Sequence, residues 1–350
     1  MDKRQTFLAS FPNGYFMDAA DLGAMDAYLH KQSWLSAGEK ILSAQKPGEG
    51  NMNYVLRITT STRTFILKQS RPWVEKYPQI AAPVERTLVE AKFFQAVEKS
   101  TSASVFTPKL LGYDALNFIL ALEDLGEGAD FTYLYQKGNH LTRAEIHSLV
   151  DFVSRLHKEA TGAVLEDFPE NRQMRLLNHE HIFRFPFSEE NGFDLNQVQP
   201  GLEAISLPYK QDESLKQKIA GLGDVYLSEG TTLIHGDYYP GSWLKVKNEV
   251  KVIDPEFGFA GYPEFDLGVF LAQMKLASQG KEIMQEIFSG YGGTQSLDME
   301  LLAGFAGTEI LRRLIGLAQL PVSFTLDEKA VILAQAAEAI RTGKIEKLFS

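Results

Sequence analysis

The sequence predicts an α+β fold of two lobes, in which a small N-terminal antiparallel β-sheet lobe precedes a larger, mostly helical C-terminal lobe. Apolar patterns typical of strands dominate the first third of the 350 residues, whereas the periodicity of amphipathic helices dominates the rest. The change falls near residue 125, which predicts lobes over residues 1–125 and 126–350 with a cleft between them.

The first lobe combines a sheet with two helices. Two strand-like segments joined by a polar linker resemble a hairpin, and Pro83 is a residue type that often opens a helix. The predicted elements are, in order, a helix over 16–35, strands over 54–58 and 64–68, a helix opened by Pro83, and an apolar strand over 118–122.

Helices dominate the second lobe, where apolar residues recur with helical spacing. The segment 163–208 is polar, aromatic and interrupted by proline, and we interpret it as a substrate-facing insertion. The predicted elements are helices near 146–156, 210–227, 264–289, 297–320 and 326–348, and short strands near 232–235 and 250–254.

Composition excludes several classes of protein. The net charge of -10 argues against a nucleic-acid binder but is compatible with cationic substrates. The absence of cysteine excludes disulfides, thiolate metal sites and cysteine nucleophiles. No run approaches the ~20 apolar residues of a membrane span, and the apolar stretch at the N-terminus is too short for a signal peptide. We therefore expect a cytoplasmic protein without nucleic-acid or membrane partners.

Carboxylates follow two short apolar strands of the second lobe. Asp237 lies in a His-Gly-Asp loop, and Asp254 and Glu256 follow the strand near 250–254. Phosphoryl transfer needs one carboxylate to accept a hydroxyl proton and others to hold Mg²⁺ against ATP. Asp237 is the predicted base, and Asp254 and Glu256 are the predicted Mg²⁺ ligands. Ser242 follows where protein kinases place a metal-binding Asn, which makes it a further candidate ligand.

A glycine-rich segment precedes the predicted hairpin. Gly48 and Gly50 allow backbone N–H groups to approach a phosphate closely. With Asn51 and Asn53 they form a candidate nucleotide-binding loop, for which an ordinary turn is the alternative.

Lys68 ends an apolar strand and needs a partner there, because an unpaired buried charge is costly. Glu90 on the following helix is the candidate, and kinase-like folds use such a pair to position phosphates. A surface lysine at a strand end is the alternative. The backbone of Glu123, Asp124 and Leu125 at the lobe boundary is a candidate adenine-binding segment, with a polar strand exit as the alternative.

Two further polar features lie within apolar helices. Arg312 and Arg313 are adjacent in an otherwise apolar helix, so we expect either a contact with an anionic or hydroxylated ligand or a salt bridge to Glu309. Asp266 is predicted to cap the following helix or to brace the catalytic loop. His235 is interpreted as a residue that holds this loop by hydrogen bonds.

Taken together, these motifs occur in kinase order and resemble the aminoglycoside phosphotransferase and choline kinase superfamily, which has a bilobal protein-kinase-like fold. Within it, the likeness is to methylthioribose kinases. It rests on Gly-Glu-Gly-Asn-Met-Asn before the hairpin, Ser242 in place of Asn, Asp-Pro-Glu-Phe from residue 254, and the arginine helix over 309–318. Tyr238-Tyr239-Pro240 departs from this family's Leu-His-Thr.

The resemblance implies ATP and Mg²⁺ as cofactors, a small-molecule hydroxyl acceptor and a homodimer. It also implies that Lys68 contacts phosphate, that Asp237 is the base, and that Arg312 and Arg313 lie on the substrate side. The predicted function is phosphorylation of a sugar-like metabolite, methylthioribose or a relative. The alternatives are a phosphotransferase for a cationic amino alcohol, such as an aminoglycoside or choline, and a nucleotide-binding pseudokinase.

Overall fold

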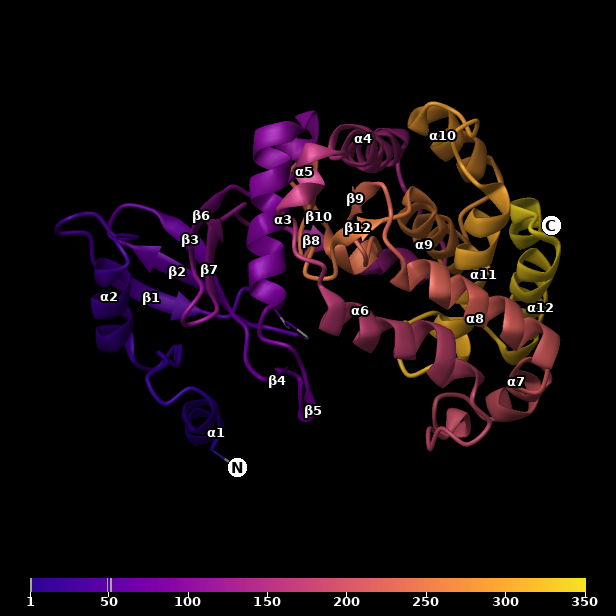
Figure 1. Cartoon of the computed structure of the whole chain (residues 1–350), viewed down its shortest axis with the longest axis horizontal. Helices are drawn as coiled ribbons and strands as arrows, with labels where there is room; N and C mark the ends of the chain where they lie inside the picture. Colours follow the sequence, from indigo (N-terminus) through magenta and orange to yellow (C-terminus); the bar gives the residue numbers. More distant parts are fainter. Residues whose placement is uncertain (1, 49, 51) are drawn as a thin grey trace.

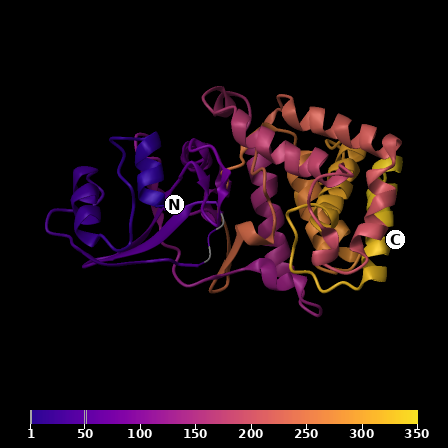
Figure 2. The ribbon, with the colours of Figure 1, turned by 90° about the horizontal axis from the view of Figure 1, so that it is seen from below.

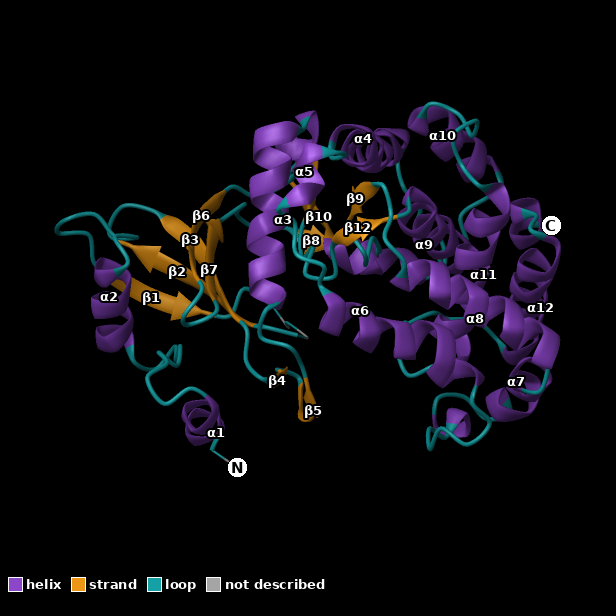
Figure 3. Ribbon diagram, viewed as in Figure 1, coloured by secondary structure: helices purple, strands orange, loops and turns teal. Residues whose placement is uncertain are grey.

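The computed structural model describes residues 2–48, 50 and 52–350, and the chain forms two lobes side by side along its longest axis (Figures 1 and 2). The N-terminal lobe holds a five-stranded antiparallel sheet, and the C-terminal lobe is mostly helical (Figure 3). The predicted α+β fold of two lobes is therefore confirmed. The predicted division between residues 125 and 126 falls in the segment just after the last strand of this sheet.

The sheet of the N-terminal lobe is built from β1 (Ile41–Gln45), β2 (Tyr54–Thr60), β3 (Thr64–Gln69), β6 (Leu110–Asp114) and β7 (Ile119–Glu123). Its order is β1-β2-β3-β7-β6. β2 and β3 form the predicted hairpin, with Leu56 opposite Leu67. Because side chains alternate between the faces of a strand, Leu56 and Leu67 enter the core on one face. Ile66 and Lys68 reach the opposite face, which borders the cleft.

The helices of this lobe are α1 (Lys3–Ser10), α2 (Leu22–Lys31) and α3 (Arg86–Ser100). The helix predicted over 16–35 is shorter, because Asp21 caps its start and Ser33, with φ of 59°, follows its end. α3 begins at Arg86 rather than Pro83, because Glu85 is its N-cap and the Glu85 carbonyl accepts from Val89 N at 3.1 Å, whereas the Pro83 carbonyl accepts from the Arg86 side chain. α3 packs against β6 and β7 and lies between the sheet and the helical lobe in Figure 1.

The helical lobe contains α4 (Arg143–Glu159), α7 (Leu202–Lys210), α8 (Glu213–Leu227), α9 (Pro263–Leu276), α10 (Glu282–Tyr291), α11 (Met299–Ile315) and α12 (Leu326–Thr342). α11 packs between α9 and α12. The prediction of one helix over 264–289 is wrong. The Gln279 side chain donates to Asn139 O and accepts from Leu141 N, and these contacts hold a turn between α9 and α10.

The segment 163–208 forms short helices that pack mainly against α8 and α11. They are α5 (Ala163–Glu166), α6 (Arg172–His179), a π-helical turn at Glu180–Arg184, 3-10 turns at Phe185–Phe187 and Leu195–Gln197, and the start of α7. The interpretation of this segment as a substrate-facing insertion stays a prediction.

Small sheets carry the loops that border the cleft. β9 (Thr232–Ile234) pairs with β12 (Phe259–Gly261), and a second sheet joins β8 (Ala129–Asp130), β10 (Trp243–Val246) and β11 (Glu249–Val252). β4 (Trp73–Val74) pairs with β5 (Tyr77–Ala81) on the N-terminal side. β9 and β11 correspond to the two short strands predicted near 232–235 and 250–254.

Among the helices that the structure describes, none combines the length and the apolar character that crossing a membrane requires.

Candidate active site

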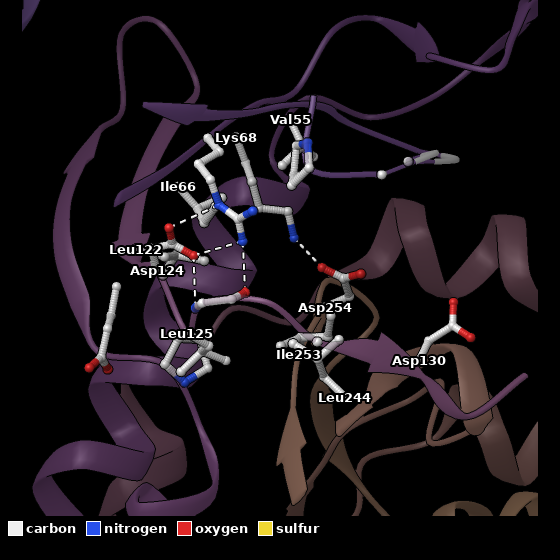
Figure 4. Close-up of a pocket in the computed structure, with 18 of the residues that line it drawn as sticks. Val55, Ile66, Lys68, Leu122, Asp124, Leu125, Asp130, Leu244, Ile253 and Asp254 are labelled. Carbon is white, nitrogen blue, oxygen red and sulfur yellow. Dashed lines mark hydrogen bonds and ion pairs between the residues drawn. The ribbon is translucent and has the colours of Figure 1, made fainter. Parts of the chain in front are cut away.

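A cavity of about 600 Å³ lies between the lobes and brings together segments far apart in the sequence (Figure 4). Its apolar walls come from the sheet and from the C-terminal lobe, including Val55, Ile66, Leu122, Leu244 and Ile253. An apolar slot with a few polar groups at one end suits a flat heterocycle joined to a charged chain.

Lys68 and Asp254 form the charged end of this cavity. Lys68 Nζ lies 2.7 Å from Glu90 Oε1 on α3 and also contacts Asp254 Oδ1. The predicted partnership of Lys68 with Glu90 is therefore confirmed. Burial would lower the pKa of Lys68, but the surrounding carboxylates outweigh it and raise that pKa above its usual range. Lys68 is thus held as a cation with its charge facing the cavity.

The glycine-rich loop forms one edge of the cavity. Gly48 and Gly50 line it, whereas Asn51 lies outside the described residues. The Asn53 side chain is buried and donates to Glu256 Oε2 at 2.8 Å. Its observed contacts are therefore with protein groups behind the loop.

The segment that links the lobes borders the other end of the cavity. Glu123, Asp124 and Leu125 all line it, but the two acidic side chains make structural contacts. Glu123 Oε2 accepts from Lys109 N at 3.1 Å. Asp124 forms an ion pair with Arg57 of β2, with Arg57 Nε 2.9 Å from Asp124 Oδ2. Arg57 was not singled out from the sequence, because nothing local to β2 indicates a partner 67 residues away.

Hydrogen bonds to the Asp266 side chain support the loop that carries Asp237. Asp266 accepts hydrogen bonds from His235 N at 2.7 Å and Gly236 N at 2.9 Å, so the predicted bracing of this loop is confirmed. Gly236 has φ of 81°, and a Cβ atom there would lie 2.1 Å from Phe257 O. Only glycine fits this position.

The ring of His235 contributes to the same support. Its Nε2 lies 3.0 Å from the Ile253 carbonyl, and its Nδ1 faces the Asp237 N–H at 3.4 Å. A neutral ring that donates from Nε2 and accepts at Nδ1 satisfies both contacts. Burial lowers the pKa of His235, which favours the same neutral state. The geometry agrees with the interpretation of His235 as a structural residue.

Two arginines face the half-buried Asp237. Arg312 Nη2 and Arg313 Nη2 lie 3.8 and 3.6 Å from Asp237 Oδ1. Burial raises the pKa of Asp237, and the two guanidinium groups oppose that shift. A carboxylate with this raised pKa and an exposed edge is suited to accept a proton.

Glu309 holds both arginines in this orientation. It contacts Arg312 Nε, and its Oε1 accepts from Arg313 Nε at 2.8 Å. Gln273 supports Glu309 from α9 through a 2.6 Å hydrogen bond. The salt bridge to Glu309, one of the two alternatives left open for the arginines, is therefore confirmed, and an Nη2 atom of each arginine also lies within 4 Å of Asp237. Tyr239, part of the segment that departs from the family's Leu-His-Thr, lies beside this cluster, with its ring centroid 4.9 Å from the Arg313 guanidinium carbon.

Of the three predicted metal ligands, Asp254 is among the residues that line the cavity, whereas Glu256 and Ser242 are buried. Asp254 has φ of 62°, uncommon for a residue other than glycine, and lines the cavity. Glu256 is buried against Asn53. Ser242 Oγ donates to Asp237 O at 2.9 Å, so its hydroxyl supports the loop.

The described residues contain no cluster of three or more acidic, histidine or cysteine side chains able to hold a metal ion. Mg²⁺ does not need one, because it is commonly bound through one or two carboxylates, water and substrate phosphates. The hard oxygen donors of Asp254 and Glu256 therefore fit Mg²⁺ together with a nucleotide.

Comparison with known proteins agrees with this geometry. The Phosphotransferase enzyme family (APH) matches residues 43–304, and the chain belongs to this family. It is 26% identical over 343 residues to a methylthioribose kinase of Bacillus cereus, covering 85% of this chain and 84% of that protein. A methylthioribose kinase of Bacillus thuringiensis is 25% identical over the same shares.

Solved structures show the same fold. A spectinomycin phosphotransferase, APH(9)-Ia, has a TM-score of 0.51 at 13% identity, covering 96% of this chain and 99% of that one. A choline/ethanolamine kinase family protein of Mesorhizobium loti has a TM-score of 0.50 at 12% identity, covering 93% and 97%. The predicted protein-kinase-like fold and family resemblance are confirmed, and the chain is a small-molecule phosphotransferase.

The value of kcat/KM should fall at low pH as Asp237 becomes protonated. Because the pKa of Asp237 is raised, this fall should occur at a higher pH than an ordinary aspartate would give. A base must be ionised, so kcat/KM should rise with pH through the raised pKa of Asp237. Arg313→Gln removes a charge that lowers this pKa and should move the acid limb upward by about one pH unit. Arg341→Gln, which loses only a surface pair with Asp212, should leave the limb in place. An unshifted limb in Arg313→Gln would argue against Asp237 as the titrating base.

Proposed function

We propose that this protein is an ATP- and Mg²⁺-dependent kinase that phosphorylates a hydroxyl group of methylthioribose or a closely related sugar-like metabolite. The observation that carries the proposal is the position of Asp237, a half-buried carboxylate faced by Arg312 and Arg313. The methylthioribose kinases at 25–26% identity support the acceptor, and the cleft with its Lys68–Glu90 pair supports the nucleotide.

The nucleotide would lie with its base between the sheet and Leu244, close to the backbone of residues 123–125. Lys68 would then neutralise phosphate oxygens at the charged end of the cavity. Asp254 and Glu256 would hold Mg²⁺, which would neutralise phosphate charge. Glu90 holds Lys68 in place before the nucleotide arrives.

Asp237 would act on the acceptor. Its carboxylate takes the hydroxyl proton while the hydroxyl oxygen bonds to the γ-phosphorus and the bond from that phosphorus to the β–γ bridging oxygen breaks. The products are the phosphorylated acceptor and ADP, and the proton resides on Asp237. Arg312 and Arg313 direct hydrogen-bond donors toward the same space, where they can orient acceptor hydroxyls.

The charge beside Asp237 favours a neutral acceptor over a cationic one. Arg312 and Arg313 would repel an ammonium group, whereas cationic ligands are usually held by carboxylates or aromatic cages. The overall charge of -10 does not reverse this, because exposed charges are screened over a Debye length of about 8–10 Å. The residues of the cleft also support a catalyst rather than a pseudokinase, since Lys68, Asp237 and Asp254 all have side chains that can perform the roles proposed for them.

An acceptor screen tests the proposal. Purified protein with ATP and Mg²⁺ should form ADP in a saturable way with methylthioribose and remain near background with choline and an aminoglycoside. If the protein phosphorylated only cationic acceptors and not methylthioribose, the substrate assignment would be overturned. If no alcohol in a broad panel led to ADP formation, the assignment as a kinase would be overturned.

A further inference from the structure

A buried contact joins the lobes beside the predicted metal-binding turn. Asn53 Nδ2, at the end of the glycine-rich loop, donates a 2.8 Å hydrogen bond to Glu256 Oε2. Arg86 Nε lies 3.6 Å from the same oxygen. Asn53, Arg86 and Glu256 are 5%, 0% and 6% exposed. Because buried polar groups are costly unless paired, these side chains stabilise one another at the lobe interface.

Arg86 fixes the N-terminal side of this contact. Its Nε donates to Asn53 Oδ1 at 2.8 Å, and its Nη atoms donate to the carbonyls of Met52 and Arg71, each at 3.0 Å. A guanidinium presents its donors in a rigid plane. One side chain therefore sets the exit of the glycine-rich loop, the segment after β3 and the start of α3, which carries Glu90.

The C-terminal side is fixed through the backbone of the turn. Asn171 Nδ2 donates to the carbonyls of Glu256 and Gly258, each at 3.0 Å. The Ile253 N–H donates to Ser242 O at 3.0 Å, which ties the turn to the loop of Asp237. The backbone of the turn thus belongs to the C-terminal lobe, and the Glu256 side chain reaches across to the other lobe.

We propose that Asn53 and Arg86 are positioning residues that orient the Glu256 carboxylate for Mg²⁺ and couple the glycine-rich loop to the metal-binding turn. The inference rests on the proposed function, in which Glu256 is a Mg²⁺ ligand. Asn53 holds Oε2, and in this proposal the second oxygen of the carboxylate would bind the metal. Removing a partner behind a metal ligand typically weakens metal binding by about 10–100-fold.

Asn53→Asp tests the coupling with little change of shape. The aspartate still offers an oxygen to Arg86 and to Ser70, which donates to Asn53 Oδ1 at 3.1 Å, but it cannot donate to Glu256 and repels it. Isothermal titration calorimetry should show ADP binding with Mg²⁺ weakened about tenfold, with much less change in EDTA. If Mg²⁺ increased the ADP affinity of Asn53→Asp as much as it increases that of the wild type, the proposal would be overturned.

Asn117→Asp is the matched control. Asn117 lies in the turn between β6 and β7, and its Nδ2 donates to Asp114 Oδ2 at 2.6 Å. Asn117→Asp therefore also places two carboxylates next to each other, in the N-terminal lobe that contains Asn53. Its melting temperature should fall, but its gain in ADP affinity from Mg²⁺ should match that of the wild type. An equal loss in both variants would indicate a general weakening of the lobe and overturn the specific coupling.

A melting cycle without nucleotide or metal tests the contact itself. The changes in melting temperature of Asn53→Asp, Glu256→Gln and the double variant should be non-additive, because Asn53→Asp places a second carboxylate beside Glu256, and Glu256→Gln removes that repulsion and can donate to the new carboxylate. Additive shifts would overturn the contact. Failure of the acceptor screen would overturn the kinase assignment but leave these binding and melting results standing, so the two proposals fail separately.

Discussion

Asp237→Asn should lower kcat by about 10³-fold, within the range that general-base catalysis contributes. An amide keeps the size of the carboxylate but cannot take the hydroxyl proton. It also leaves Arg312 and Arg313, which lie 3.8 and 3.6 Å from Asp237 Oδ1, without that anionic neighbour. ADP binding should change little, because the predicted nucleotide contacts come from Lys68 and the lobe-linking segment. Steady-state kinetics with methylthioribose and calorimetry with ADP check the two expectations.

Asp212→Asn is the control for this substitution. Asp212 caps α8 and pairs with Arg341 at the surface, so its loss should affect stability by a small amount and leave kcat unchanged. An Asp237→Asn protein that folds, binds ADP and retains near-wild-type turnover would remove Asp237 from the role of base. Parallel losses of kcat in both variants would point to damaged folding.

The charges around Asp237 explain why four ionised groups can lie together in a largely buried cluster. Asp237 and Glu309 are two anions, and Arg312 and Arg313 are two cations, so their formal charges cancel. Burial would raise the pKa of Glu309, but the two arginines lower it below its usual value. Glu309 is thus held ionised, which limits how strongly the arginines stabilise the Asp237 carboxylate. That balance keeps Asp237 basic enough to accept a proton.

Local patterns in the sequence were sufficient for the elements with strong periodicity. Two strand-like segments joined by a polar linker predicted the hairpin of β2 and β3, and the need to pair a buried lysine predicted the contact of Lys68 with Glu90, observed at 2.7 Å. The helix predicted over 264–289 failed for a tertiary reason. Gln279 binds backbone groups of Asn139 and Leu141, and periodicity carries no information about such distant partners.

The contacts that organise the candidate site are also distant in sequence. Asn53 and Glu256 are 203 residues apart, and the Arg57–Asp124 pair spans 67. Asn53 was expected to face a nucleotide because it follows two glycines, but its side chain turns toward Glu256. The composition of a loop indicates which backbone can approach a phosphate. It does not indicate which side chains are needed behind the loop, because that depends on the packing of both lobes.

Asp254→Asn should reduce kcat/KM by about 10³-fold, because the charge stabilisation by a metal is worth several kcal/mol. Asp254 lines the cavity, contacts Lys68 and is 45% exposed at its side chain, so it is the accessible hard oxygen donor at that end. The amide is a poorer Mg²⁺ ligand and removes one of the anions that raise the pKa of Lys68. Calorimetry should show that Mg²⁺ no longer strengthens ADP binding.

Asp130→Asn separates loss of the metal ligand from a general change of charge. Asp130 also lines the cavity, but it caps the following 3-10 turn by accepting from Thr132 N, so its carboxylate is already used in the structure. The control should retain the dependence of ADP binding on Mg²⁺. If Asp254→Asn retained it as well, Asp254 would not be the metal ligand, and its contact with Lys68 would be the reason for its place in the cavity.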